Sequence, residues 1–169
     1  MDKQSLFFTS LVAIVATGLF LMGIQFLARK LNIKSEKEQK ITISYSIWTT
    51  SIVIAFFMFL KVALGLVENS IELIIYSKTI DNAFIAVMQK IAVFSGFTFL
   101  FTFLAYYVVH VLLTFTIGKR NDGIEMEKEN IGYFIIKGAL LILLVFSLIT
   151  IFEHFLGWFV IKVDTPFYH

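Results

Sequence analysis

The sequence predicts an all-α, polytopic membrane protein with four transmembrane helices arranged as two tandem hairpins. Of its 169 residues, 59% are hydrophobic and only 15% are charged, and the mean hydropathy is +0.87. The apolar content is higher and the charged content lower than in water-soluble domains. Four apolar segments are each long enough, as helices, to cross a hydrocarbon core of about 30 Å. A similar charged motif follows the first and the third of these segments.

The predicted spans form a single domain over residues 1–169 and cover about residues 6–28, 41–67, 83–118 and 131–160. The first segment is too long for a removable signal and lacks a clear cleavage site, so we expect it to be the first span. Apolar and charged residues alternate loosely over 70–80, which is typical of a short interfacial helix. Asp81 and Asn82 are candidate caps for the third span, and the Asn-Asp-Gly sequence at 121–123 indicates a turn.

The basic residues predict the orientation of the chain. Eight of them lie in the two loops that follow the first and third spans: Arg29, Lys30, Lys34, Lys37, Lys40, Lys119, Arg120 and Lys128. The positive-inside rule places these loops in the cytoplasm and both termini outside, in a bacterial inner membrane. We therefore interpret the net charge of +2 as a topology signal. The glutamates between the basic residues argue against an electrostatic nucleic-acid site.

The two loops carry a repeated pattern. Arg-Lys at 29–30 is followed by Glu-Lys-Glu-Gln at 36–39, and Lys-Arg at 119–120 is followed by Glu-Lys-Glu-Asn at 127–130. This pattern predicts a tandem duplication of one helical hairpin with a period of about 91 residues. The alternative is chance, since basic pairs and Glu-Lys runs are common between any two spans.

The duplicated hairpin, with its Glu129-Asn130 step into the last span, resembles the DUF350 family of small bacterial inner-membrane proteins over about residues 10–157. The chain departs from the family pattern where Gln39-Lys40 replaces the asparagine of the first repeat. Bulky residues also stand where the family tends toward glycine and alanine. The resemblance implies a four-span fold and no defined biochemical role.

A stripe of polar side chains winds slowly around the third span. Its members lie four residues apart, so neighbouring pairs share a helix face: Thr98, Thr102, Tyr106, His110 and Thr114. Around a symmetry axis shared by several copies, this stripe would line a pore. A histidine with hydroxyl neighbours can also relay protons. The alternative is that a neighbouring hydroxyl or carbonyl simply satisfies it.

Ionisable side chains within a membrane span are costly and are therefore candidates for function. Besides His110, four such residues are present: Lys61, Lys137, Glu153 and His154. The repeat places Lys61 and Glu153 at a similar depth, where they would either form an ion pair or each reach interfacial water. His110 and Lys137 each lie about two helical turns from the predicted cytoplasmic end. There they could line a polar cavity.

Several classes of chemistry find no support in the sequence. The chain has no cysteine, which excludes disulfides, thiol catalysis and thiolate metal sites. No metal-ligand spacing, phosphate loop, nucleophile elbow or redox motif is present. No pair of catalytic groups can be placed within reach of each other from the sequence. We therefore expect no enzyme activity, no cofactor and no metal.

The sequence favours a homo-oligomeric ion channel or pore in the lipid bilayer, because four spans give one copy too little interior for a conduit. By analogy of size and topology, it could be a gated effector, as in bacterial anti-phage defence. A cytoplasmic protein or nucleotide-type regulator would then bind the basic loops through Arg29, Lys30, Lys34, Lys119 and Arg120. Two alternatives stay open. One is a non-conducting accessory subunit that anchors a soluble partner, and the other is a small proton-coupled transporter that titrates at His110 or Glu153.

Overall fold

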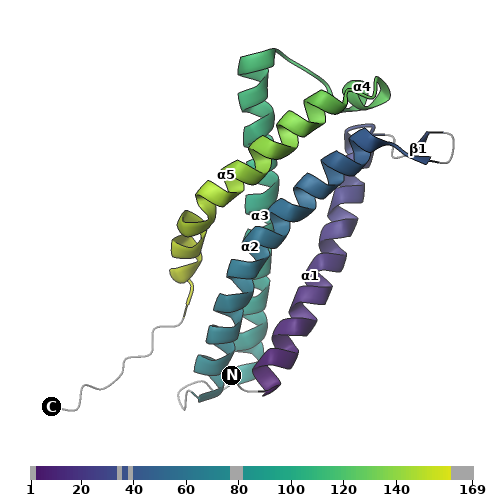
Figure 1. Ribbon diagram of the computed structural model, residues 1–169. Helices are drawn as coiled ribbons and strands as arrows, with labels where there is room; N and C mark the ends of the chain where they lie inside the picture. Colours follow the sequence, from purple (N-terminus) through teal and green to yellow (C-terminus); the bar gives the residue numbers. More distant parts are fainter. Residues whose placement is uncertain (1–2, 34–35, 38–39, 77–81, 161–169) are drawn as a thin grey trace.

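A computed structural model describes residues 3–33, 36–37, 40–76 and 82–160 of the chain. In chain order its elements are α1 (Lys3–Lys30), β1 (Glu36–Lys37), β2 (Lys40–Ile41), α2 (Ile43–Tyr76), α3 (Ala83–Ile117), α4 (Asp122–Glu127) and α5 (Ile131–Gly157) (Figure 1). The helices α1, α2, α3 and α5 are each long and apolar enough to cross a membrane. The helical class and the four candidate spans are thus as predicted and compatible with a membrane protein.

The helices α1 and α3 end, and α2 and α5 begin, at the same end of the bundle (Figure 1). We call this end the loop end (residues 28–33, 40–43 and 117–131). Arg29 and Lys30 occupy the last turn of α1, where cations interact favourably with the helix dipole. The two charged loops that the sequence pairs as repeats differ in structure. The first contains the β1–β2 bridge, and the second contains α4.

The predicted interfacial helix is not separate from the second span, because α2 continues without a break to Tyr76. The reason is that one buried face runs on past the predicted end of the span, with apolar residues spaced four, four and three apart: Ala63, Val67, Ile71 and Ile74. The remainder of that prediction, residues 77–80, lies outside the described residues. At 1.5 Å per residue, α2 and α3 are each about 50 Å long, more than a bilayer core needs.

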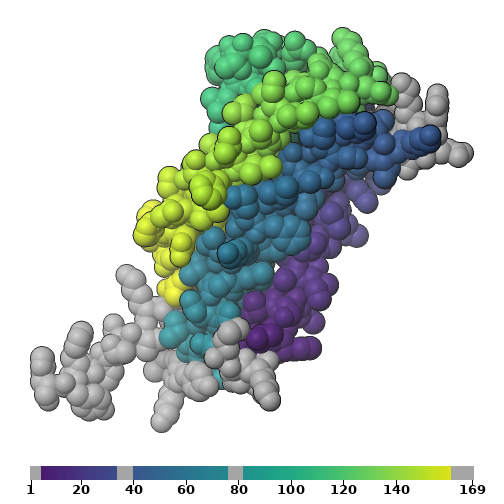
Figure 2. All heavy atoms as spheres, viewed as in Figure 1, coloured from purple at the N-terminus to yellow at the C-terminus, as the bar shows by residue number. Residues whose placement is uncertain are grey.

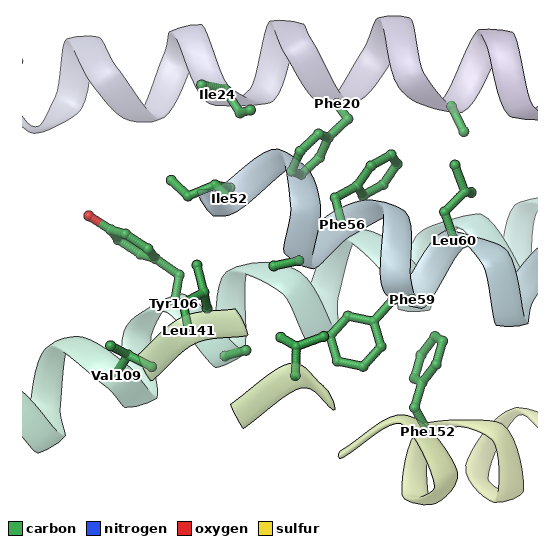
Figure 3. Close-up of a cluster of buried hydrophobic side chains, with 14 of the residues drawn as sticks. Phe20, Ile24, Ile52, Phe56, Phe59, Leu60, Tyr106, Val109, Leu141 and Phe152 are labelled. Carbon is green, nitrogen blue, oxygen red and sulfur yellow. The ribbon is translucent and has the colours of Figure 1, made fainter. Parts of the chain in front are cut away.

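The helix α2 is the centre of the packing and contacts α1, α3 and α5, whereas α1 and α3 contact each other only sparsely. Figure 2 shows α2 and α5 side by side along one face of the molecule. Phenylalanine rings fill much of the interior (Figure 3). Phe20 stacks on Phe56 with ring centroids 3.8 Å apart, and Phe59 lies 4.6 Å from Phe152.

Near the loop end, α2 and α5 approach each other closely at Gly138. A Cβ atom added to this glycine would lie 2.1 Å from the Ser51 Oγ atom and 3.0 Å from the Ser51 Cβ atom, so a larger residue would require the Ser51 side chain or the helices to shift. The neighbouring residue Lys137 lies beside this contact, near Trp48 of α2 and Tyr106 of α3.

Candidate functional site

The short helix α4 is held at the loop end by its own cap and by a close contact with the residues that follow α1. Asn121 is the N-cap, and its side-chain oxygen accepts hydrogen bonds from the backbone N–H groups of Gly123 (2.9 Å) and Ile124 (3.3 Å). A Cβ atom on Gly123 would lie 2.6 Å from the Leu31 carbonyl oxygen. The predicted turn at 121–123 is therefore the start of a helix, and this helix directs the side chain of Asp122 into the bundle.

Asp122 forms a buried ion pair with Lys137 of α5. The Lys137 Nζ atom lies 2.5 Å from the Asp122 Oδ2 atom, and each side chain is only 3% exposed. Burial disfavours the charge on Asp122, but the Lys137 ammonium and hydrogen bonds from Lys137, Tyr106 and Tyr133 outweigh it and hold the carboxyl pKa below its ordinary value. The site therefore favours the ionised form of the Asp122 carboxyl group.

Three aromatic side chains complete the hydrogen bonding around this pair. The Tyr133 hydroxyl donates to the Asp122 Oδ1 atom at 2.7 Å, and the Tyr106 hydroxyl donates to Oδ2. The Tyr106 oxygen in turn accepts from the Trp48 Nε1 atom at 3.0 Å and from the Lys137 Nζ atom at 3.1 Å. The lysine ammonium also lies 4.3 Å from the centre of the Tyr106 ring, a cation–π distance. Side chains of α3 and α5 therefore meet at the carboxylate of α4, and Trp48 of α2 joins the network through Tyr106.

His110 joins this network from its exposed edge. Its Nδ1 atom lies 3.4 Å from the Lys137 Nζ atom and 4.0 Å from the Asp122 Oδ1 atom, and its side chain is 36% exposed. An ammonium group can only donate, so Nδ1 accepts from Lys137 and the ring proton is assigned to Nε2. Each of the three ammonium protons of Lys137 then has an acceptor, in Asp122, Tyr106 and His110.

A second, more superficial set of bonds fastens α4 to its flanking residues. The Arg120 guanidinium donates to the Glu125 Oε1 atom at 3.0 Å, and the Asn130 side-chain amide donates to Oε2 at 2.6 Å. The Asn130 hydrogen bond, joined by the Arg120 interactions, lowers the pKa of Glu125 against the opposing effect of burial. Asn130 also caps α5 by accepting from the Tyr133 N–H group. This set therefore couples the end of α4 to the start of α5.

A pocket of about 700 Å³ lies beside the network, between the end of α1, the outer part of α3 and residues 119–128. Five basic side chains are part of its lining: Lys30, His110, Lys119, Arg120 and Lys128. Tyr106, Asp122 and Glu125 also line it. The pocket therefore gives His110 and the edge of the buried network a shared opening at the loop end.

The predicted polar stripe divides into two parts. Thr98, Thr102 and Tyr106 are buried within one copy, whereas His110 and Thr114 are half-buried. The threonine hydroxyls of 98, 102 and 114 each donate to the carbonyl oxygen four residues earlier, at 2.8 to 2.9 Å. Only Tyr106 and His110 take part in the network. A pore lining made by the whole stripe stays a prediction.

The other predicted residues lie at different places. Lys61, Glu153 and His154 are exposed on their helices. Within the described part of the chain, Lys61 and Glu153 form no ion pair with each other, which leaves the alternative that each reaches interfacial water. Arg29 is exposed outside the pocket lining. Lys34 lies outside the described residues.

Asp122, Trp48 and Tyr133 of the site were not predicted from the sequence. A usable signal was present, because a lysine in an apolar span needs an acidic partner. Asp122 precedes Lys137 by only 15 residues. The structure brings together four ionisable side chains that could not be placed near one another from the sequence, Tyr106, His110, Asp122 and Lys137. Their hydrogen-bonding groups are directed largely at one another, which suits a clamp or a proton relay.

Among the described residues, no group of three or more His, Cys, Asp or Glu side chains is arranged to hold a metal ion. Comparison of the chain with models of known protein families, with curated proteins and with solved structures finds no match. The resemblance to the DUF350 family thus stays a prediction, and the residues of the site are the basis for any functional argument.

Proposed function

We propose that this protein is a subunit of a homo-oligomeric membrane channel in which α4 controls opening. One observation carries the proposal: the Asp122 carboxylate of a helix outside the four spans is buried against Tyr106 of α3 and Lys137 of α5. Ionisable groups inside a membrane bundle are costly and point to function. Withdrawing the carboxylate would leave the lysine charge buried without its partner, so this pair holds α4 in the docked state, and in the proposed mechanism the channel opens when α4 is released.

The packing within a single copy supports an ion path that lies between copies and does not pass through one of them. Phe20, Phe56, Phe59 and Phe152 are almost completely buried and occupy the interior with their rings (Figure 3). All four candidate spans also carry large exposed apolar side chains, which suit contacts with lipid and with further copies. Movement of α3 against α5, the two helices that Asp122 joins, would change such contacts.

The test is potassium flux from liposomes that contain the purified protein, with Asp122→Asn as the variant. Glu125→Gln is the matched control, because it makes the same acid-to-amide change in α4 outside the buried pair. We expect Asp122→Asn to change the flux at least tenfold and Glu125→Gln to leave it near wild type. Cross-linking in the same liposomes should give an oligomer. A single copy, with no flux from wild type or Asp122→Asn, would overturn the proposal.

A second candidate, a small proton-coupled transporter, is favoured by the position of His110. Its ring lines the pocket and contacts Lys137 of the buried pair, so it connects the opening with the network. Imidazole is the side chain suited to changing charge between about pH 5 and 8. Proton uptake driven by a pH gradient should fall at least tenfold in His110→Gln and persist in the exposed control His154→Gln. Equal uptake in both variants would exclude this role for His110.

A further inference from the structure

We propose that the pocket at the loop end binds an anionic phospholipid from the bilayer leaflet that it meets. The phosphate would lie against the basic side chains, and the start of an acyl chain would follow the apolar wall toward the membrane. This inference is independent of the proposed channel function, because it concerns binding at one copy and holds whether or not the protein conducts ions.

The charge of the lining is the first argument. Lys30, Lys119, Arg120 and Lys128 contribute four positive charges, and Asp122 and Glu125 contribute two negative ones, a balance of +2 before His110 is considered. The two carboxylates are already engaged. Asp122 is paired with the buried ammonium of Lys137, and Glu125 accepts from Arg120 and Asn130. The pocket thus presents an excess of positive charge, which complements a phosphate group.

The apolar part of the lining is the second argument, and it favours a lipid over a soluble anion. Leu27 of α1, together with Phe103 and Tyr107 of α3, forms one wall of the pocket. Tyr107 is 63% exposed, and Leu104, about one helical turn earlier in α3, is exposed as well. The pocket therefore opens onto a surface that would face the bilayer. A small soluble phosphate would leave this wall uncovered, whereas an acyl chain would cover it.

The sparse contact between α1 and α3 is the third argument. Both helices contribute to the lining, and they meet through side chains, since a Cβ atom on Gly23 of α1 would lie 3.4 Å from the Phe103 ring of α3. Their backbones therefore stay apart and leave room for a chain to lie along the apolar wall. The volume of about 700 Å³ falls within the range of about 300–1,000 Å³ for small-molecule sites. It suits a glycerophosphate headgroup with the first part of one chain.

The test is native mass spectrometry of the full-length protein in detergent, titrated with dioleoylphosphatidylglycerol or dioleoylphosphatidylcholine. We expect the anionic lipid to bind at least fivefold more tightly than the zwitterionic one. Lys30→Gln and Lys119→Gln should each weaken binding of the anionic lipid about fivefold, as expected for loss of one cation near a lipid phosphate. Arg29→Gln is the matched control, because it removes the adjacent charge on α1 outside the pocket lining.

A second variant tests the apolar wall without changing any charge. Leu27→Trp places a larger side chain in the pocket and should weaken lipid binding at least fivefold. Circular dichroism and thermal unfolding establish that each variant is folded. Equal binding of the two lipids, or equal weakening by Arg29→Gln and Lys30→Gln, would overturn the proposal because either result indicates a non-specific surface effect.

Soluble phosphates form the remaining arm of the experiment. Inorganic phosphate and ATP, each at millimolar concentration, should fail to displace bound dioleoylphosphatidylglycerol. Displacement by ATP that Lys30→Gln abolishes would overturn the lipid assignment and identify the pocket as a site for a soluble phosphorylated ligand. Because the readout is bound mass, failure here is distinct from failure of the flux experiment.

Discussion

Replacing Asp122 with asparagine should release α4 from the bundle. The change removes the charge that faces the Lys137 ammonium, and both side chains of the wild-type pair are only 3% exposed. Loss of one partner from a buried ion pair costs about 3–5 kcal/mol. The asparagine side chain still accepts one hydrogen bond, so we take the lower value, about 3 kcal/mol. This corresponds to an increase of about 150-fold in the opening equilibrium of α4.

Hydrogen–deuterium exchange of the 122–130 segment measures this opening directly. In the docked state the backbone N–H groups of Glu125, Lys128 and Asn130 donate to the carbonyl oxygens of Asn121, Ile124 and Glu125. Their exchange should be about 150-fold faster in Asp122→Asn, in which α4 opens more often. Glu125→Gln should accelerate it less than about fivefold, because its ion pair with Arg120 is partly exposed and such pairs contribute about 1 kcal/mol or less.

A double variant separates loss of the pair from loss of the carboxylate itself. Asp122→Asn combined with Lys137→Met removes both charges and should restore exchange to within about tenfold of wild type, since no unpaired charge is then buried. The reasoning is refuted if Asp122→Asn accelerates exchange less than threefold, or no more than Glu125→Gln does.

Three further predictions concern pH and packing. Because folding lowers the pKa of Asp122 from its ordinary value of 3.8, its contribution is complete above that pH and is lost as the pH falls through the lower folded value. Exchange of 122–130, corrected for its intrinsic rate, should thus be constant from about pH 6 to 8 and rise below about pH 4; a rise near pH 6 would implicate another group. Gly138→Ala should destabilise the protein by about 1–3 kcal/mol through overpacking, and Gly157→Ala, which has open space, should not; equal melting temperatures would contradict this. Phe56→Ala should cost about 3–5 kcal/mol by leaving a cavity, whereas loss of the half-exposed Phe57 ring should cost much less in the same thermal assay.

The four candidate spans could be predicted from the sequence because long apolar helices carry their signal locally. The end of α2 was harder to predict. Glu68 and Glu72 lower the hydropathy beyond Val67 and make the segment look interfacial. The buried face nevertheless continues through Ile71 and Ile74. Packing against other helices decides where this helix ends, and hydropathy does not report that packing.

The candidate site could be predicted only in part. Tyr106, His110 and Lys137 stood out as polar or ionisable groups within apolar spans, and the structure brings them together. Asp122 was concealed by its context, because Asn-Asp-Gly is also a good turn sequence. The contact of Gly123 with the Leu31 carbonyl determines that the carboxylate points inward. That contact joins residues 92 positions apart, and no local pattern encodes it.

The Asp122–Lys137 pair also has a consequence for how the protein is made. As a membrane span, α5 would enter the bilayer with a lysine near its beginning, and a charged side chain disfavours insertion. Its counter-charge lies 15 residues earlier in the same stretch of chain, so it leaves the ribosome first. The carboxylate that neutralises the lysine is therefore supplied by the segment just before α5, and Tyr106 and Trp48 of the earlier helices supply further hydrogen bonds of the network.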